Sequence, residues 1–265
     1  MTDTQTGSEP NDILQLAISE QIAVITLNRP ASRNALSLAM RDAIINTMNS
    51  VSENPDVRVV ILTGNGKAFC AGLDLKELQS IGHPMKPTAV GTKSPVVKAF
   101  RDCPKPIIGA INGYAITGGF ELALACDFLY AAESAQFADT HARVGLVPGW
   151  GLSQKLPRLI GINRAREMSF SGNFISARDA ESWGLVNRVF PDGDLMDQTT
   201  KIAAQIAETR PDTLDRIRRM MNSGWEMTLG DGLRMEGENA GQHNSRTGLG
   251  EMGDRLSELK ARSKS

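Results

Sequence analysis

Two short segments of this chain are almost continuously apolar, and they limit the folds it can adopt more than any other feature. They are VRVVILTG (57–64) and KPIIGAING (105–113). A strand with one face in water alternates apolar and polar residues, whereas a strand buried on both faces does not. Both segments are therefore predicted to be inner strands of a parallel sheet that is covered on each face.

The segments around these two strands follow strand and helix patterns in turn. ILQLAI (13–18) and IAVITL (22–27) are rich in β-branched residues, and three polar residues separate them, as in a hairpin. Apolar residues then recur at steps of four and three from Leu36 to Val51, which predicts a helix. Because strands and helices alternate in this way through most of the chain, we expect an α/β fold.

Local signals place two further helix starts. A helix is expected to begin near Gly118, where GGFELALACD follows a buried strand. Ser176 and Asp179 have the spacing of a capping box, in which each side chain bonds to the backbone N–H of the other residue. A helix is therefore expected to open directly after Ser176.

The two ends of the chain differ from this alternating core, which we place at residues 13–194. Residues 1–12 are polar and contain no apolar run, so we expect a disordered tail without a signal peptide or mitochondrial leader. Residues 195–265 show only helical periodicity, and Pro211 fits the first turn of a helix. We expect this last part to be a small helical layer or an oligomerisation arm.

The charge and the cysteines exclude several classes of protein. A net charge of −1 gives no field for binding nucleic acid or an anionic membrane. No apolar run approaches the roughly 20 residues that a membrane-spanning helix needs. Cys70, Cys103 and Cys126 have no paired spacing, so we expect neither disulfides nor a zinc site. The lack of a disulfide framework in turn favours a cytoplasmic location.

Two glycine-containing loops run into helices in the same way. They are KAFCAGLDLKEL (67–78) and NGYAITGGFELAL (112–124). Each helix start leaves backbone N–H groups without a partner and carries the positive end of a helix dipole. Two such ends brought together would form an oxyanion hole. The alternative is that these glycines only permit tight turns, and neither loop has the spacing of a nucleotide-binding motif.

Glu121 lies three residues beyond Gly118, on the same side of the expected helix. It is followed by the apolar run LALAC, so burial would raise its pKa and suit it to carry a proton. The alternative is a glutamate that faces solvent or pairs with an arginine. The spacing alone favours neither.

The stretch FADTHARVG (137–145) holds a second candidate pair, Asp139 and His141. An imidazole exchanges protons near neutral pH, and a neighbouring carboxylate would hold one tautomer. On an extended strand the two side chains would point to the same face. The alternatives are a loop histidine outside the site, and a metal site, for which two ligands are too few. A serine-type hydrolase is disfavoured, because the residue before Gly118 is Thr117 and neither loop contains serine.

Several segments in the same order resemble the crotonase family, the enoyl-CoA hydratases and isomerases. They are LNRPASRNALS, VRVVILTGNGKAFCAGLDLKEL, KPIIGAINGYAITGGFELALACDFLYAAESAQFA, LVPGWG and SARDAESWGLVNRV. The resemblance implies an α/β spiral of ββα units followed by a helical trimerisation region. It also implies an acyl-CoA substrate, no cofactor or metal, and a homotrimer or a dimer of trimers.

The resemblance further assigns roles to individual residues. The backbone N–H groups of Leu73 and Gly118 match the two donors of the family's oxyanion hole. Trp150 stands at a turn where the family usually has a small residue, and its indole either narrows the acyl pocket or is packing. The positions implied in coenzyme A and substrate binding are Ser32, Arg33, Ala71, Asp74, Leu75, Trp150 and Lys260.

The chain departs from the hydratase pattern at one position. Glu121 falls on the first of two glutamates that the family's hydratases use around the attacking water. The second normally follows just past the strand that ends here in QFA, where this chain has His141. Three functions remain open. The first is a hydratase in which His141 orients or deprotonates the water and Glu121 delivers the proton, with Asp139 holding the tautomer of His141 or, if the chain turns, entering the site itself. The others are a Δ3,Δ2-isomerase or other acyl-CoA hydrolase or lyase, and a non-catalytic acyl-CoA-binding protein.

Overall fold

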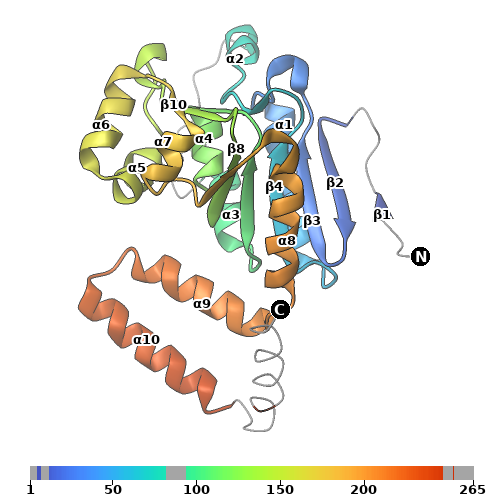
Figure 1. The fold of residues 1–265 in the computed structure, drawn as a ribbon, viewed down its shortest axis with the longest axis vertical. Coiled ribbons are helices and arrows are strands. Elements are labelled where there is room, and N and C mark those ends of the chain that lie inside the picture. The colour runs from blue at the N-terminus through green and yellow to red at the C-terminus, as the bar shows by residue number, and fades with distance from the viewer. Residues whose placement is uncertain (1–4, 7–11, 82–93, 247–252, 254–265) are drawn as a thin grey trace. The chain divides into compact units, whose positions relative to one another are not determined.

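The computed structural model describes residues 5–6, 12–81, 94–246 and 253. The chain forms two compact units, Met1–Pro211 and Asp212–Ser265, and each is described by itself. Figure 1 shows the strands together with most of the helices in the first unit.

A sheet of seven strands forms the centre of the first unit, in the order β1-β2-β3-β4-β6-β8-β11. The first three strands pair antiparallel, which confirms the predicted hairpin, and the pairs from β3 to β11 are parallel. The strands are β1 (Gln5–Thr6), β2 (Leu14–Ser19), β3 (Ile22–Leu27), β4 (Val59–Gly64), β6 (Ile107–Ile111), β8 (Phe128–Ala132) and β11 (Arg188–Phe190).

A smaller sheet has the order β10-β9-β7-β5. Here β5, β7 and β9 are parallel, and β10 pairs antiparallel with β9. Its strands are β5 (Ala68–Cys70), β7 (Tyr114–Ile116), β9 (Gln136–Ala138) and β10 (Ile175–Ser176).

The two sheets are built from a repeated order of elements. β4 in the large sheet is followed by β5 in the small sheet and then by α2 (Leu75–Ile81). β6 and β7 are followed in the same way by α4 (Gly118–Ala123). β8 and β9 continue the series and lead through η4 (Ala142–Val144) to α5 (Leu152–Ile160). This repetition matches the expected spiral of ββα units.

The two apolar segments form inner strands that are buried on both faces, as predicted. Val59 and Ile61 of β4 pack in one cluster with α8 (Leu195–Ala207), which runs along this face of the sheet (Figure 1). Val60 and Leu62 point into the main core on the other face. Every residue of β6 is buried as well. Burial on both faces explains why neither segment alternates apolar with polar residues.

The predicted helix after the hairpin is α1 (Leu38–Glu53). The hydroxyl of Ser37 accepts the backbone N–H of Met40 at 3.1 Å and caps the helix. The buried side chains of α1 are those of the predicted apolar series, namely Met40, Ile44, Met48 and Val51.

The other two predicted helix starts are confirmed. α4 begins at Gly118. α7 (Ala177–Ser182) opens with the capping box of Ser176 and Asp179, and both of its hydrogen bonds are present. The other helical elements among the described residues of this unit are η1 (Pro30–Ser32), α3 (Pro95–Asp102), α6 (Ile162–Ser171) and η5 (Asp192–Asp194).

The described part of the second unit contains two helices: α9 (Pro211–Gly224), whose first residue, Pro211, is the last of the first unit, and α10 (Leu229–Asn244). The hydroxyl of Thr213 and Nε2 of His243 are 3.0 Å apart. Nη1 of Arg216 donates to Oδ1 of Asn239 at 3.1 Å. These contacts join residues near opposite ends of the two helices, which therefore run antiparallel. The oligomerisation role expected for residues 195–265 stays a prediction.

Candidate active site

The carboxyl ends of two parallel strands bring the candidate site residues together. β7 and β9 are neighbours in the small sheet, and their last residues lie opposite each other. After β7 the chain passes through Thr117 into α4, which carries Glu121. After β9 it turns through Asp139 into His141. The two segments are far apart in sequence but leave the same edge of the sheet side by side.

Glu121 is buried, with 4% of its surface exposed. Its Oε1 accepts the backbone N–H groups of Trp150 at 2.6 Å and Leu152 at 3.4 Å, where the chain enters α5. Burial raises the pKa of Glu121, and these two N–H groups and His141 oppose the rise without cancelling it. The carboxyl group therefore keeps a proton at a higher pH than an ordinary glutamate does, as a proton donor requires.

A turn, not an extended strand, joins Asp139 to His141. His141 has helical dihedral angles (φ −52°, ψ −49°) and precedes η4. Oδ1 of Asp139 accepts the backbone N–H of His141 at 3.2 Å and lies 2.6 Å from ring atom Nδ1. Aspartate side chains commonly bond in this way to the backbone two residues further on. The turn thus brings the two side chains into contact.

The ionisation of Asp139 sets the tautomer of the neutral His141 ring. Burial raises the pKa of Asp139, but hydrogen bonds from His141 and from Ser169 on α6 outweigh burial, so the pKa lies below its ordinary value. An ionised carboxylate only accepts hydrogen bonds, so Nδ1 must be the protonated nitrogen. Nε2 is then left with its lone pair.

The second ring nitrogen of His141 faces Glu121. Nε2 lies 3.6 Å from Oε2 of Glu121, and the two side chains are 7% and 4% exposed. His141 therefore lies beside Glu121 and not apart from it, and Glu121 is buried and has no arginine partner among the described residues. A basic ring nitrogen next to a carboxyl group with a raised pKa places a proton acceptor beside a proton donor.

The two backbone N–H groups expected to form an oxyanion hole lie next to each other. A Cβ atom on Gly118 would lie 3.6 Å from the backbone nitrogen of Leu73, and one on Gly72 would lie 3.1 Å from that of Gly118. Within the described part of the chain, neither N–H donates to a protein acceptor. Gly118 and Glu121 belong to the same turn of α4, so one of the two donors and the buried carboxyl group are carried by the same helix.

The loop that carries Leu73 is paired to residues 29–37. Leu36 and Leu73 form an isolated parallel bridge. The N–H of Leu36 donates to the carbonyl of Gly72 at 2.7 Å, and the N–H of Asp74 donates to the carbonyl of Leu36 at 3.4 Å. The backbone on each side of Leu73 is therefore held, while its own N–H points away from the bridge partner.

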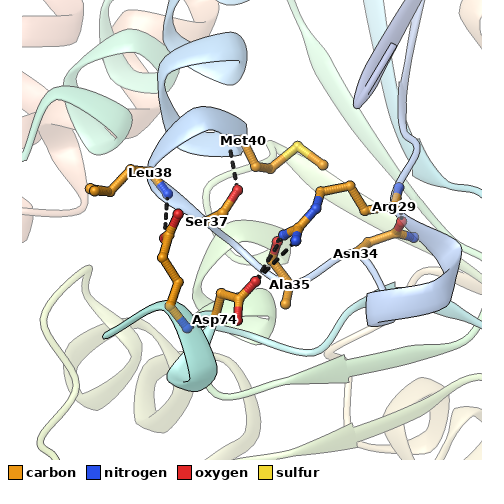
Figure 2. Close-up of polar contacts among 8 residues, drawn as sticks. Arg29, Asn34, Ala35, Ser37, Leu38, Met40 and Asp74 are labelled. Carbon is orange, nitrogen blue, oxygen red and sulfur yellow. Dashed lines mark hydrogen bonds and ion pairs between the residues drawn. The ribbon is translucent and has the colours of Figure 1, made fainter. Parts of the chain in front are cut away.

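An ion pair reinforces this bridge (Figure 2). Both terminal nitrogens of Arg29 lie near Oδ2 of Asp74, at 3.0 and 3.1 Å, and Nη1 also donates to the carbonyl of Ala35 at 2.7 Å. Oδ1 of the buried Asn34 accepts the backbone N–H of Arg29 at 2.8 Å. Arg29 therefore ties the residue next to Leu73 to the neighbouring loop.

Five of the residues assigned to coenzyme A and substrate binding, namely Ser32, Arg33, Ala71, Asp74 and Leu75, lie along these same two loops or at their ends. Ser32 and Arg33 are exposed, and the carbonyl of Arg33 accepts the N–H of Ala71 at 3.0 Å. Leu75 is 43% exposed and begins α2. Lys260 lies outside the described residues. The binding roles stay predictions, and for Asp74 the structure adds the contact with Arg29.

Trp150 contacts the site through its backbone. Its N–H is the shorter of the two hydrogen bonds to Glu121, and its partly buried side chain packs against the main core. The expected influence of the indole on an acyl pocket stays a prediction. Any residue except proline has a backbone N–H that could make this hydrogen bond, so the residue type at position 150 does not predict it.

Three further side chains support the site, and no sequence pattern identifies them. Arg29 reaches Asp74 across 45 positions. Thr140 bonds to Thr117, and Ser169 bonds to Asp139. Each contact joins segments that are distant in the chain, so local periodicity and spacing carry no information about it.

The described residues contain no group of three or more His, Cys, Asp or Glu side chains that could hold a metal ion. The helices among them are all too short or too polar to cross a membrane. Independence from a cofactor stays a prediction.

The fold and the site define the class of protein. Residues 17–252 match the family model for enoyl-CoA hydratase/isomerase, and the chain belongs to this family. It is 45% identical over 221 residues to a protein of Arabidopsis thaliana named probable enoyl-CoA hydratase 1, peroxisomal, a match that covers 83% of this chain and 82% of that protein. It is 35% identical over 230 residues to the mitochondrial enoyl-CoA hydratase of Pongo abelii, covering 81% and 73%.

Solved structures confirm the predicted fold. The enoyl-CoA hydratase of Bacillus anthracis superposes with a TM-score of 0.81 at 37% identity and covers 96% of each chain. The enoyl-CoA hydratase of Mycobacterium tuberculosis H37Rv has a TM-score of 0.74 at 43% identity, over 88% of this chain and all of that one. The crotonase-like α/β spiral is therefore the fold of this protein.

Proposed function

We propose that this protein adds water across the 2,3 double bond of an enoyl-CoA thioester. The observation that carries the proposal is the buried pair of Glu121 and His141, whose Oε2 and Nε2 atoms are 3.6 Å apart. The relatives named as enoyl-CoA hydratases support the same reaction. The acid and the base that a hydration needs are then one carboxyl group and one imidazole.

In the proposed reaction, the N–H groups of Leu73 and Gly118 bind the thioester oxygen, where negative charge develops. Nε2 of His141 takes a proton from water as the hydroxyl oxygen bonds to C3, and the electron pair of the double bond moves toward the thioester oxygen. The carboxyl group of Glu121 delivers its proton to C2. The proton on His141 then passes to Glu121, which restores both groups and leaves a 3-hydroxyacyl thioester.

A Δ3,Δ2-enoyl-CoA isomerase is the second candidate, and one observation favours it. The isomerase reaction moves one proton between two carbon atoms and needs a single carboxylate as carrier. Asp139 is engaged by His141 and by Ser169, which leaves Glu121 as the carrier. Under this alternative His141 orients Glu121 and takes no proton from water.

The experiment that separates the candidates follows the ultraviolet absorbance of the enone. We expect the wild-type protein to bleach crotonyl-CoA, and Glu121→Gln and His141→Ala each to lower kcat by about 10²- to 10⁴-fold. The control is Glu53→Gln, which changes an exposed glutamate on α1. A 3-enoyl-CoA substrate gains absorbance if the enzyme is an isomerase, and in that case only the Glu121 variant is inactive.

Two other outcomes contradict the proposed hydration. If no acyl chain length gives an absorbance change while thioester binding persists, the protein is a non-catalytic acyl-CoA-binding protein. If His141→Glu hydrates faster than the wild type, His141 serves another reaction on an acyl-CoA, such as hydrolysis or another lyase reaction.

The proposed assembly is a homotrimer or a dimer of trimers formed through residues 195–265. Exposed large apolar side chains on and between α9 and α10 support it, because patches of this kind mark contacts between proteins. They are Ile217, Met221, Trp225, Met227, Leu229 and Leu233. The cytoplasmic location also stays a prediction, since the relatives include proteins named as peroxisomal and mitochondrial.

A further inference from the structure

Thr117, the residue between β7 and α4, has a backbone conformation that threonine seldom adopts. Its φ is 54° and its ψ is −114°. A positive φ is rare outside glycine and is an outlier for a β-branched residue, whose side chain crowds the backbone. Glycine would adopt these angles without that crowding. Strained residues of this kind cluster at functional sites, so the contacts of the threonine side chain are informative.

The hydroxyl of Thr117 is bonded to the turn that follows β9. Its Oγ1 and the Oγ1 of Thr140 are 2.5 Å apart, and it accepts the backbone N–H of Thr140 at 3.3 Å. The backbone N–H of Thr117 donates to the carbonyl of Ala138, the last residue of β9, at 2.9 Å. Only 8% of the surface of Thr117 is exposed, so water competes little for these bonds.

The hydrogen bonds between the Thr117 hydroxyl and Thr140 form a latch between the segment that carries Glu121 and the segment that carries His141. Thr140 stands between Asp139 and His141, and the bond from its N–H to Thr117 ties their turn to the other segment of the site. On the other side, Thr117 directly precedes the helix of Glu121. The Thr117 hydroxyl therefore links the segment that holds the imidazole to the segment that holds the carboxyl group.

We infer that Thr117 is a positioning residue for His141. Its hydroxyl holds the turn of residues 139–141 so that Nε2 of His141 faces Glu121, and the strained backbone of Thr117 is the consequence of aiming that hydroxyl at Thr140. The catalytic effect of this latch rests on the proposed function, whereas its effect on the ring of His141 does not.

Thr117 does not fit the role of a nucleophile. Its hydroxyl contacts Thr140, while Nε2 of His141 faces Glu121. A nucleophilic hydroxyl needs a base within hydrogen-bond reach, and here the ring points its free nitrogen elsewhere.

Three variants test the latch. Thr117→Gly relieves the strain and removes the hydroxyl, Thr117→Ser keeps the hydroxyl, and Thr140→Val keeps the shape of Thr140 without its hydroxyl. With crotonyl-CoA we expect Thr117→Gly and Thr140→Val to lower kcat by about 10- to 100-fold with KM nearly unchanged, since a misplaced catalytic group slows the reaction more than it weakens binding. Thr117→Ser should stay within about threefold of the wild type, and Thr117→Gly should stay folded, because relief of the backbone strain offsets part of the cost of the lost hydrogen bonds.

The matched control for strain relief is Glu20→Gly. Glu20 has a φ of 50° in the tight turn between β2 and β3, away from the site. We expect this variant to keep the kcat of the wild type and to melt no lower. If Glu20→Gly loses activity as well, added backbone flexibility explains the effect and the latch is wrong.

A second readout follows the His141 ring by nitrogen-15 and proton NMR, with His141→Ala to assign the signal. We expect a downfield Nδ1–H resonance in the wild type and in Thr117→Ser, and its loss or shift in Thr117→Gly and Thr140→Val. An unchanged ring resonance in a folded Thr117→Gly or Thr140→Val overturns the inference, whatever happens to kcat. If the resonance changes in Thr117→Gly and Thr140→Val but the wild type hydrates no substrate, the proposed function is wrong and the positioning role of Thr117 is supported.

Discussion

Nε2 of His141 lies 3.6 Å from Oε2 of Glu121, and the surrounding protein almost completely buries both side chains. The pair forms because β7 and β9 are adjacent parallel strands whose following segments leave the same edge of the small sheet. The carboxyl group and the imidazole are therefore fixed relative to each other by strand pairing, before any substrate binds.

Glu121→Gln should make the protein more stable at neutral pH. Burial raises the pKa of Glu121 in the folded state, so the folded protein binds its proton more tightly than the unfolded chain does. The contribution of protonated Glu121 to the stability of the folded state is complete below the pKa of this group in the unfolded chain. It is lost as the pH rises through the pKa of Glu121 in the folded protein. We expect the melting temperature of the variant to exceed that of the wild type by a few degrees at pH 7 to 8, and the difference to vanish below about pH 4.

Thermal unfolding between pH 4 and pH 8 checks this expectation. Glu53→Gln, on the exposed face of α1, should show no such divergence with pH. A Glu121→Gln protein that melts below the wild type at pH 8 would mean that the ionised carboxylate stabilises the fold.

Asp139→Asn should lower both activity and stability. The amide keeps the size of the carboxylate but no longer enforces a proton on Nδ1, and in a comparable Asp–His pair the wrong tautomer lowers kcat by about 10⁴-fold. The pKa of Asp139 lies below its ordinary value because the hydrogen bonds from His141 and Ser169 outweigh burial. Ionised Asp139 therefore stabilises the folded state above the pKa of this group in the unfolded chain. This stabilisation is lost as the pH falls through the pKa of Asp139 in the folded protein.

We therefore expect Asp139→Asn to cost about 1.5–3 kcal/mol of unfolding free energy at pH 7 and less under acid conditions. Urea unfolding at pH 7 and at acid pH measures the difference. Ser169→Ala, which removes only one of the hydrogen bonds to Asp139, should show a smaller loss in both assays. Equal kcat values for wild type and Asp139→Asn would exclude a tautomer-setting role.

The Arg29–Asp74 ion pair should affect turnover more than substrate binding. Burial raises the pKa of Asp74, but hydrogen bonds from the backbone of Glu77 and from Arg29 outweigh it, so the pKa is lowered. The stabilisation from this pair is lost as the pH falls through the folded pKa of Asp74. Loosening the loop displaces the N–H of Leu73, so Arg29→Ala should reduce kcat by about tenfold.

A double-mutant cycle with Arg29→Ala and Asp74→Ala isolates the pair. We expect a coupling free energy of about 1 kcal/mol, because the two side chains are only 23% and 14% exposed. The control cycle uses the more exposed pair of Arg219 and Asp215 on α9, where coupling should be closer to zero. Coupling of the same size in both cycles would assign no special role to the loop contact.

Leu233→Asp should break the proposed trimer. Leu233 is 59% exposed on α10, and a carboxylate there would be costly to bury between copies of the chain. Size-exclusion chromatography with light scattering should show a fall in molar mass, while Leu233→Ile keeps the assembly. An unchanged molar mass in Leu233→Asp would place the interface elsewhere.

The strands and helices of the core follow from the sequence because their signals are local. VRVVILTG is apolar throughout because both faces of β4 are covered. The capping box of Ser176 and Asp179 needs only residues three apart. Gly118 marks the start of α4 for the same reason, since the helix opens where the buried strand pattern stops.

The arrangement of the site was decided by the tertiary structure. An extended chain would have placed Asp139 and His141 on one face, yet their contact depends on a turn that Thr140 and Thr117 hold together. Arg29 meets Asp74 only because residues 29–37 pair with the loop of Leu73. Residue type and spacing identify the groups that can carry protons. Which of these groups come into contact depends on strand pairing and loop contacts between distant segments. Short-range periodicity carries no information about such contacts.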